Sequence, residues 1–183
     1  MFEITPEDIA NLDDRQLRTL VGLLCEAELR SRGCSTVAVS WGGDQNATDG
    51  GLDVRVSGPR RDWDDGFIPR CCTGFQVKRQ DMPPGAITAE MRPNGTLRPA
   101  IRDLAEQGGA YIIVSSRGST SDSALANRKK AMSEAASSVA GQLHSDFYDR
   151  TRLATWVRNH PGLVVWVRGA VGRSISGWEA FGP

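Results

Sequence analysis

Two short stretches of this sequence decide its fold: residues 49–56, which read DGGLDVRV, and residues 75–79, which read FQVKR. Both have the composition of a β-strand, yet each places polar side chains between apolar ones. Because side chains alternate across a strand, Gln76 and Lys78 share one face and Val77 lies on the other. The second stretch is therefore expected to present an amide and an ammonium group side by side.

The same alternation in the first stretch separates a carboxylate from its apolar neighbours. Leu52 and Val54 share one face, and Asp53 lies on the opposite face. An Asp at the start of one strand and a Gln-x-Lys on another are the groups needed to hold a divalent cation beside a phosphodiester. The spacing of 23 residues between Asp53 and Gln76 allows one connection between neighbouring strands. Taken singly, the first stretch also fits a turn that enters a strand, and the second fits an edge strand with a solvated face.

A helix is expected over residues 15–32, with N-capping residues at 11–14 and a stop at Gly33. On a helical wheel of about 100° per residue, Glu28 falls within the apolar face that is centred on Leu24. A carboxylate that faces the core is costly unless it is paired, and a metal ion is one such partner. Glu28 is therefore a candidate metal ligand that comes from the helix.

Strands and helices alternate along the remainder of the chain, which predicts an α/β sandwich with a central mixed sheet. The apolar runs at 110–114 and 163–167 are typical of strands that are buried on both faces. Further strands are expected at 36–40 and around the two key stretches, helices at 98–107, 122–139 and 149–158, and a loop at 81–96.

Length and composition restrict the class of protein. The 183 residues fit a single domain, 1–183, that can bury a proper core. The 22 basic and 22 acidic residues balance, so nucleic-acid binding has to rely on a local basic stripe. Four cysteines without C-x-x-C spacing and only two histidines argue against a structural zinc site. With no signal peptide and no apolar run of roughly 20 residues, the expected location is the cytoplasm, with no membrane partner.

The order of these features resembles the PD-(D/E)xK, or restriction endonuclease-like, nuclease superfamily in the Gln-x-Lys form of Mrr-like members. The resemblance covers about residues 15–115. It implies a three-layer sandwich in which Asp53 is the metal-binding Asp, Gln76 the second acidic position, Lys78 the catalytic Lys and Glu28 the acid of the helix. The implied cofactor is Mg²⁺, with Mn²⁺ as a substitute, held by Asp53, Gln76, Glu28 and the main-chain carbonyl of Val77. The superfamily commonly has Asp or Glu where this chain has Gln76, which should weaken the affinity for metal.

The function implied by this resemblance is that of a metal-dependent endonuclease that hydrolyses phosphodiester bonds in double-stranded DNA. A bound cation would polarise the phosphate and activate water, while Lys78 orients that water. The pattern also resembles nuclease domains that precede a STAND-type ATPase in bacterial anti-phage proteins. That likeness implies an N-terminal part of a longer protein and a homo-oligomer formed through the fused ATPase or sensor region. The alternative is a catalytically inactive module of the same fold that binds nucleic acid or a partner protein.

Overall fold

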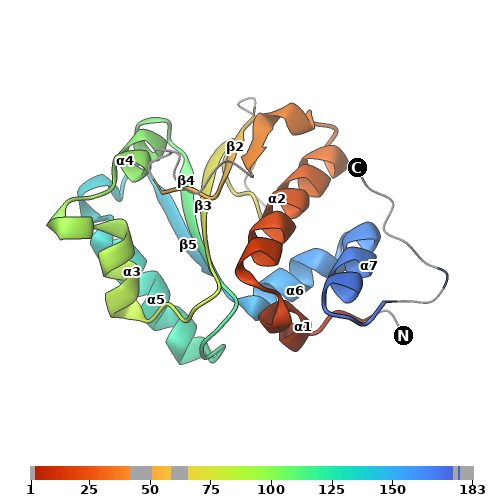
Figure 1. Ribbon diagram of the computed structural model, residues 1–183. Coiled ribbons are helices and arrows are strands. Elements are labelled where there is room, and N and C mark those ends of the chain that lie inside the picture. Colours follow the sequence, from red (N-terminus) through yellow and green to blue (C-terminus); the bar gives the residue numbers. More distant parts are fainter. Residues whose placement is uncertain (1–2, 42–50, 59–65, 175–176, 178–183) are drawn as a thin grey trace.

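The computed structural model describes residues 3–41, 51–58, 66–174 and 177, and its centre is one mixed sheet of five strands in the order β1-β2-β3-β4-β5. The first three strands pair antiparallel, and β3–β4 and β4–β5 pair parallel. Sheet order therefore follows chain order, with helical crossovers only in the second half (Figure 1). The strands are β1 (Val39–Trp41), β2 (Val54–Ser57), β3 (Cys72–Lys78), β4 (Ala110–Ser115) and β5 (His144–Tyr148).

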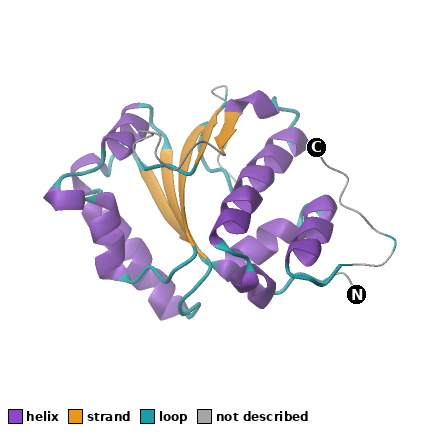
Figure 2. Ribbon diagram, in the orientation of Figure 1, coloured by secondary structure: helices purple, strands orange, loops and turns teal. Residues whose placement is uncertain are grey.

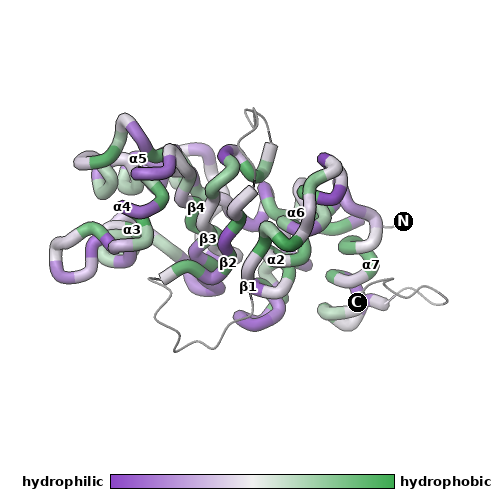
Figure 3. Tube along the Cα trace, turned by 90° about the horizontal axis from the view of Figure 1, so that it is seen from above, coloured by the Kyte–Doolittle hydropathy of each residue, from purple (hydrophilic) through white to green (hydrophobic). Residues whose placement is uncertain are grey.

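Helices cover both faces of the sheet, so the α/β sandwich expected from the sequence is confirmed (Figure 2). One layer contains α1, α2, α6 and α7, and the opposite layer contains α3, α4 and α5, as the view along the layers also shows (Figure 3). The α-helices are α1 (Pro6–Asn11), α2 (Asp14–Ser31), α3 (Pro84–Met91), α4 (Pro99–Glu106), α5 (Asp122–Ala135), α6 (Arg150–Arg158) and α7 (Pro161–Ala170). Short 3₁₀ turns are η1 (Thr36–Ala38), η2 (Pro93–Gly95) and η3 (Ser137–Val139).

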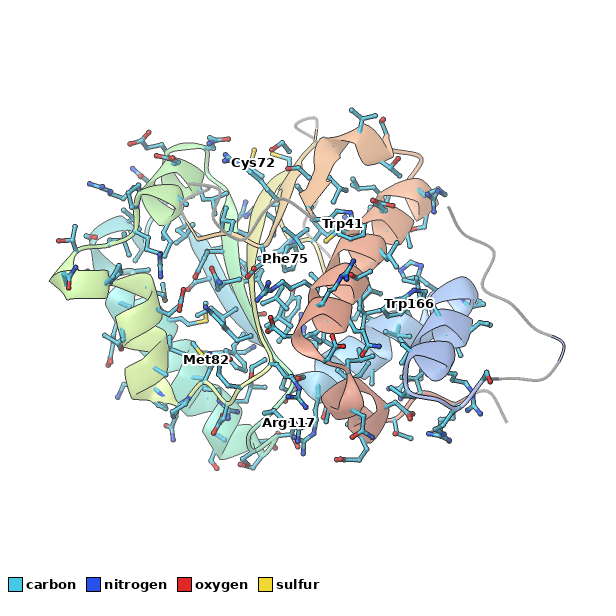
Figure 4. The ribbon with its side chains drawn as sticks, in the orientation of Figure 1. Trp41, Cys72, Phe75, Met82, Arg117 and Trp166 are labelled. Carbon is cyan, nitrogen blue, oxygen red and sulfur yellow. The ribbon has the colours of Figure 1, made fainter. Side chains whose placement is uncertain are left out.

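The alternation of side chains on the central strands divides the interior into two cores. Phe75 and Val77 of β3 pack toward α2 and α6, and Phe75 lies at the centre of the molecule between the layers (Figure 4). Tyr111 and Ile113 of β4 face the opposite core, against α3, α4 and α5. Gln76 and Lys78 belong to this second face, because they alternate with Phe75 and Val77 along β3.

The long N-terminal helix forms where the sequence predicts it, and its boundaries follow from its caps. Asp13 accepts a hydrogen bond from the Gln16 amide, while the Gln16 side chain accepts one from the Asp13 amide, which completes a capping box. Leu17, Leu20 and Leu24 are fully buried on the face that packs on the sheet. The N-terminal turn of α2 is thereby fixed near the ends of β2 and β3.

Three predicted segments differ from the structure, and one strand of the structure was not predicted. Residues 163–167 were expected to be a buried strand but lie inside α7, which starts with Pro161 at a position that favours helix starts. The expected loop at 81–96 contains α3, again with a proline, Pro84, in its first turn. The strand β5 was not predicted, because its HSDFY sequence lacks a strong apolar pattern. The expected strand at 36–40 is shorter, since η1 occupies its first half.

Two sequence-based expectations about chemistry can also be compared with the fold. Cys25, Cys34 and Cys71 form no disulfide within the described residues. None of the helices among the described residues is both long and apolar enough to cross a membrane.

Candidate functional site

The structure brings Asp53 and Gln76 into direct contact. Asp53 lies just before β2, and its amide donates a hydrogen bond to the carbonyl of Phe75 over 2.9 Å, which aligns it with β3. The Gln76 side-chain amide donates to Asp53 Oδ2 over 2.9 Å, and the Val77 main-chain amide donates to the same oxygen over 2.7 Å. The predicted approach of the two strands at these residues is therefore correct.

The carbonyl oxygen of the Gln76 side chain has an unusual environment. Gln76 is only 5% exposed, and its Oε1 finds no hydrogen-bond partner among the residues that the structure describes. A buried acceptor without a partner costs about 1–3 kcal/mol, so such atoms are uncommon in folded proteins. Because the amide nitrogen is held by Asp53, the orientation of the side chain leaves Oε1 as a free oxygen ligand next to a carboxylate.

The carboxyl group of Asp53 is itself destabilised in its ionised form. Burial raises its pKa, and the Val77 amide together with the nearby charges of Arg18 and Lys78 offsets only part of that effect. Arg18 Nε, on the first turns of α2, lies 3.2 Å from Asp53 Oδ1, and Arg18 also pairs with Asp14. An arginine thus provides the positive charge beside Asp53, from the helix layer that covers the other face of the sheet.

Lys78 lies on the same face as Gln76 and has a carboxylate partner that the sequence did not suggest. Its Nζ is 3.0 Å from Glu90 Oε2, near the end of α3. The other Glu90 oxygen is 2.9 Å from Arg98 Nη2, so the carboxylate is held between two cations. Gly51, with a φ of +91°, passes close to this group, because a Cβ there would lie 2.9 Å from Arg98 Nη1.

A second buried polar atom lies on this face of the sheet. Tyr111 is fully buried on β4, and its hydroxyl has no hydrogen-bond partner in the described parts of the chain. Burial raises the pKa of Tyr111 well above its usual range; the negative charge of Glu90 acts in the same direction, and Arg98 opposes it. The phenol therefore stays protonated and remains available as a hydrogen-bond donor near Glu90.

The structure does not bring Glu28 to these residues, so the expectation that it faces Asp53 is wrong. Its Oε1 accepts hydrogen bonds from the Arg32 guanidinium at 2.7 and 3.1 Å, and its Oε2 lies 3.1 Å from Trp156 Nε1 and 3.3 Å from His160 Nε2. The helical wheel correctly placed Glu28 on the inner face of α2. It gave no position along the axis, and Glu28 lies about 15 Å from the level of Arg18. His160, one of the two histidines of the chain, belongs to this cluster through its contact with Glu28.

Asp53 and Gln76 offer a small set of oxygen ligands for a divalent cation. No group of three or more His, Cys, Asp or Glu side chains that could hold a metal occurs within the described residues. Mg²⁺, however, is commonly held by one or two carboxylates together with water and substrate phosphate. The Asp53 carboxylate and the unpaired Gln76 Oε1 fit that requirement as hard oxygen ligands, and the Val77 carbonyl is the third predicted ligand.

Glu90 is an acidic residue of this site that the sequence did not indicate. It lies in a helix that was interpreted as a loop, because Pro83, Pro84 and Pro93 surround it. The available signal was the position of Pro84, since proline is favoured in the first turn of a helix. A helix beginning there would have placed Glu90 within reach of the end of β3.

Comparisons with known proteins give no independent identification. No protein-family model matches this chain, and neither the curated proteins nor the solved structures contain a match. What the fold defines is an α/β sandwich with a polar cluster at the junction of β2 and β3. The resemblance to PD-(D/E)xK nucleases stays a prediction from the sequence.

Proposed function

We propose that this protein is a metal-dependent endonuclease that hydrolyses phosphodiester bonds in double-stranded DNA. The observation that carries the proposal is the buried Gln76 Oε1, which has no hydrogen-bond partner among the described residues and is held next to the Asp53 carboxylate. Lys78 lies on the same face of β3, two positions further along. This arrangement suits a site for a cation and a phosphate: the Asp53 carboxylate and the Gln76 amide oxygen can bind the cation, and the Lys78 ammonium group can bind the phosphate.

Each side chain has a distinct part in the proposed reaction. The Gln76 amide nitrogen and the Val77 amide fix Asp53 in one orientation, so that its carboxylate is positioned before any ligand binds. Lys78 donates hydrogen bonds to the attacking water and stabilises negative charge that develops on the phosphate oxygens. Glu90 holds the Lys78 ammonium group in place and is itself held by Arg98.

Mg²⁺ or Mn²⁺ bound by Asp53 and Gln76 would supply a Lewis acid for the phosphate oxygen and lower the pKa of the attacking water. Arg18 has to release Asp53 Oδ1 for this binding, and Asp14 gives its guanidinium an alternative partner. The setting in anti-phage defence, the fused ATPase and the homo-oligomer belong to the same proposal, and they rest on the sequence resemblance alone.

One observation favours the alternative, a catalytically inactive module of the same fold. Arg18 neutralises Asp53, and a site with a permanent internal cation needs no metal to remain folded. In that case the cluster would be structural, and the protein would bind nucleic acid or a partner protein without cutting. Cleavage assays separate the two functions, because only the endonuclease depends on an added metal.

The test is nicking and linearisation of a supercoiled plasmid in Mg²⁺, in Mn²⁺ and in EDTA. The expected result is cleavage with either metal, none in EDTA, and loss of cleavage in Asp53→Ala and Lys78→Ala. Two control variants, Asp103→Ala and Lys130→Ala, remove the same charges from exposed helix positions and should cut normally. Undiminished cutting by Asp53→Ala would contradict the proposal, as would a complete lack of cleavage in both metals.

A further inference from the structure

A pocket of about 480 Å³ opens beside Lys78 and adjoins the candidate site, at the end of the sheet where β3 and β4 finish. Its lining residues come from three places: the start of α2, the segment after β3 and the loop after β4. Arg117, in the last of these, lies at the end of the sheet close to α1 and α2 (Figure 4). The described residues that line the pocket are Asp14, Arg18, Lys78, Arg79, Gln80 and Arg117.

Two buried serines fix the walls of this pocket. Ser115 Oγ donates to the carbonyl of Gln80 over 2.8 Å, and Ser116 Oγ donates to that of Arg79 over 3.3 Å. Both serines are fully buried, so the segments that follow β3 and β4 are fastened together. The site is thus built at the carboxyl ends of two parallel strands, where α/β proteins commonly bind ligands.

The pocket has an excess of positive charge. Among the described lining residues the one carboxylate is that of Asp14, and it is already paired with Arg18. In the described parts of the chain, neither Arg79 nor Arg117 has a carboxylate within ion-pair distance. Arg79 Nε donates to the carbonyl of Leu12 over 3.1 Å, which anchors the guanidinium and leaves its other N–H groups for a ligand.

We propose that this pocket binds a backbone phosphate of nucleic acid next to the phosphate that is cut. The geometry supports a phosphate, because two unpaired guanidinium groups face an open cavity and guanidinium binds phosphate through paired N–H donors. All six described lining side chains are charged or carry an amide, so none of them offers an aromatic surface on which a base could stack. Binding here is therefore independent of sequence, and it locates the substrate by its backbone.

The choice of nucleic acid as the source of the phosphate rests on the proposed nuclease function. The experiment is consequently a binding assay in EDTA, in which no metal-dependent cutting takes place. Fluorescence anisotropy of a labelled duplex of about 20 base pairs is measured between 50 and 200 mM salt, for the unsubstituted protein and for Arg117→Ala. Each phosphate contact contributes about 0.9 to the slope of log K against log salt. Loss of the Arg117 contact should make that slope less steep by about 0.9. Between 50 and 200 mM salt, the affinity of Arg117→Ala should therefore fall by a factor about 3.5 times smaller than the affinity of the unsubstituted protein does.

Two further variants show whether charge or structure is responsible. Arg117→Lys keeps the charge and should retain most of the salt dependence, whereas a structural effect would weaken both variants alike. Arg30→Ala, at the exposed far end of α2, is the matched control and should leave the slope unchanged. The proposal is overturned if Arg117→Ala has the same slope as Arg30→Ala, or if the unsubstituted protein does not bind the duplex. A reduced slope without plasmid cleavage would support the phosphate site while contradicting the nuclease function.

Discussion

Gln76→Glu is the substitution that examines the candidate site most directly. It replaces the Gln76 amide by the carboxylate that the PD-(D/E)xK pattern commonly has at this position. Gln76 donates to Asp53 Oδ2 over 2.9 Å, so the new carboxylate would be within hydrogen-bonding distance of an existing one. Both groups are largely buried, since Gln76 is 5% exposed and the Asp53 side chain 19%. The variant should therefore be unstable without metal and should bind metal more tightly than the unsubstituted protein.

The size of the effect follows from this geometry. Two unit charges about 4 Å apart repel each other by about 4 kcal/mol at an effective dielectric constant of about 20. The pair avoids part of that repulsion by keeping one proton, which restores a hydrogen bond between the carboxyl groups. Keeping an acid with a pKa of about 4.3 protonated at pH 7 costs about 3.7 kcal/mol, at about 1.36 kcal/mol per unit. The expected loss of unfolding free energy is therefore roughly 3–4 kcal/mol at pH 7 in EDTA.

Urea unfolding as a function of pH and Mg²⁺ measures this loss. The folded variant binds one more proton than its unfolded chain above pH 4, so its stability falls as the pH rises and the difference from the unsubstituted protein vanishes below about pH 4. Mg²⁺ at about 100 times its dissociation constant should return about 2.7 kcal/mol at pH 7. Cleavage at low Mg²⁺ should be kept or increased, because an added anionic ligand raises the affinity for the metal.

A matched variant, Gln142→Glu, makes the same chemical change at an exposed turn and should alter neither stability nor metal response. If Gln76→Glu is as stable as Gln142→Glu in EDTA at pH 7, the contact between residues 53 and 76 is not as described here. If it is destabilised but insensitive to Mg²⁺, the two oxygens do not form a cation site.

Four further substitutions have defined outcomes. Asp53→Asn should abolish cleavage and raise the unfolding free energy at neutral pH. Burial raises the pKa of the Asp53 carboxyl group, so its ionised form destabilises the folded protein, and Asn removes that charge. Urea unfolding should show this gain shrink as the pH falls and vanish below about pH 3.9, where Asp53 is protonated in both the folded and the unfolded chain. Glu28→Gln should lower the unfolding free energy by roughly 1.5–3 kcal/mol, through weaker hydrogen bonds, and leave the cleavage rate of folded protein unchanged. Glu90→Gln should reduce cleavage by the folded protein about 10–100-fold, since Lys78 loses the carboxylate that positions it, and should also lower the melting temperature, since Arg98 loses the same partner. Arg128→Met should destabilise the fold by about 3 kcal/mol in urea without altering metal dependence, because it removes buried hydrogen bonds to two main-chain carbonyls.

The sequence predicted the central strands and α2 well because their signals are local. Alternation of polar and apolar residues places Gln76 and Lys78 on one face, and capping residues at 11–14 locate the start of the helix. Both signals depend on residues that are near one another in the chain. The contact between Asp53 and Gln76 joins residues 23 positions apart; the sequence indicated only that one connection could make their strands neighbours, and the pairing of Val54 with Phe75 then brings the two side chains together.

The remaining features depend on packing that one sequence does not show. The run at 163–167 is apolar enough for a buried strand or a buried helix, and in the structure it is a helix that starts at Pro161 and packs against α2 and α6. Glu28 was placed on the correct side of α2 but at the wrong level, because a helical wheel has no axial coordinate. Glu90 was missed because three nearby prolines favoured a loop, although one of them begins the helix that carries it.

Two of the buried side-chain atoms without a hydrogen-bond partner in the described structure, Gln76 Oε1 and Arg18 Nε, lie at the junction of β2 and β3, which supports the proposed site there. Arg128 is as buried as Gln76, yet its guanidinium finds Met82, Ser119 and Asp81 as partners, so that region is stable as it stands. Around Gln76, by contrast, an amide oxygen has no partner in the described structure and burial raises the pKa of the adjacent carboxyl group. Proteins retain such destabilising arrangements where a ligand relieves them, because selection for stability alone would remove them. A cation bound by both oxygens would relieve both defects at once, and this supports the proposal of a metal-dependent site at the junction.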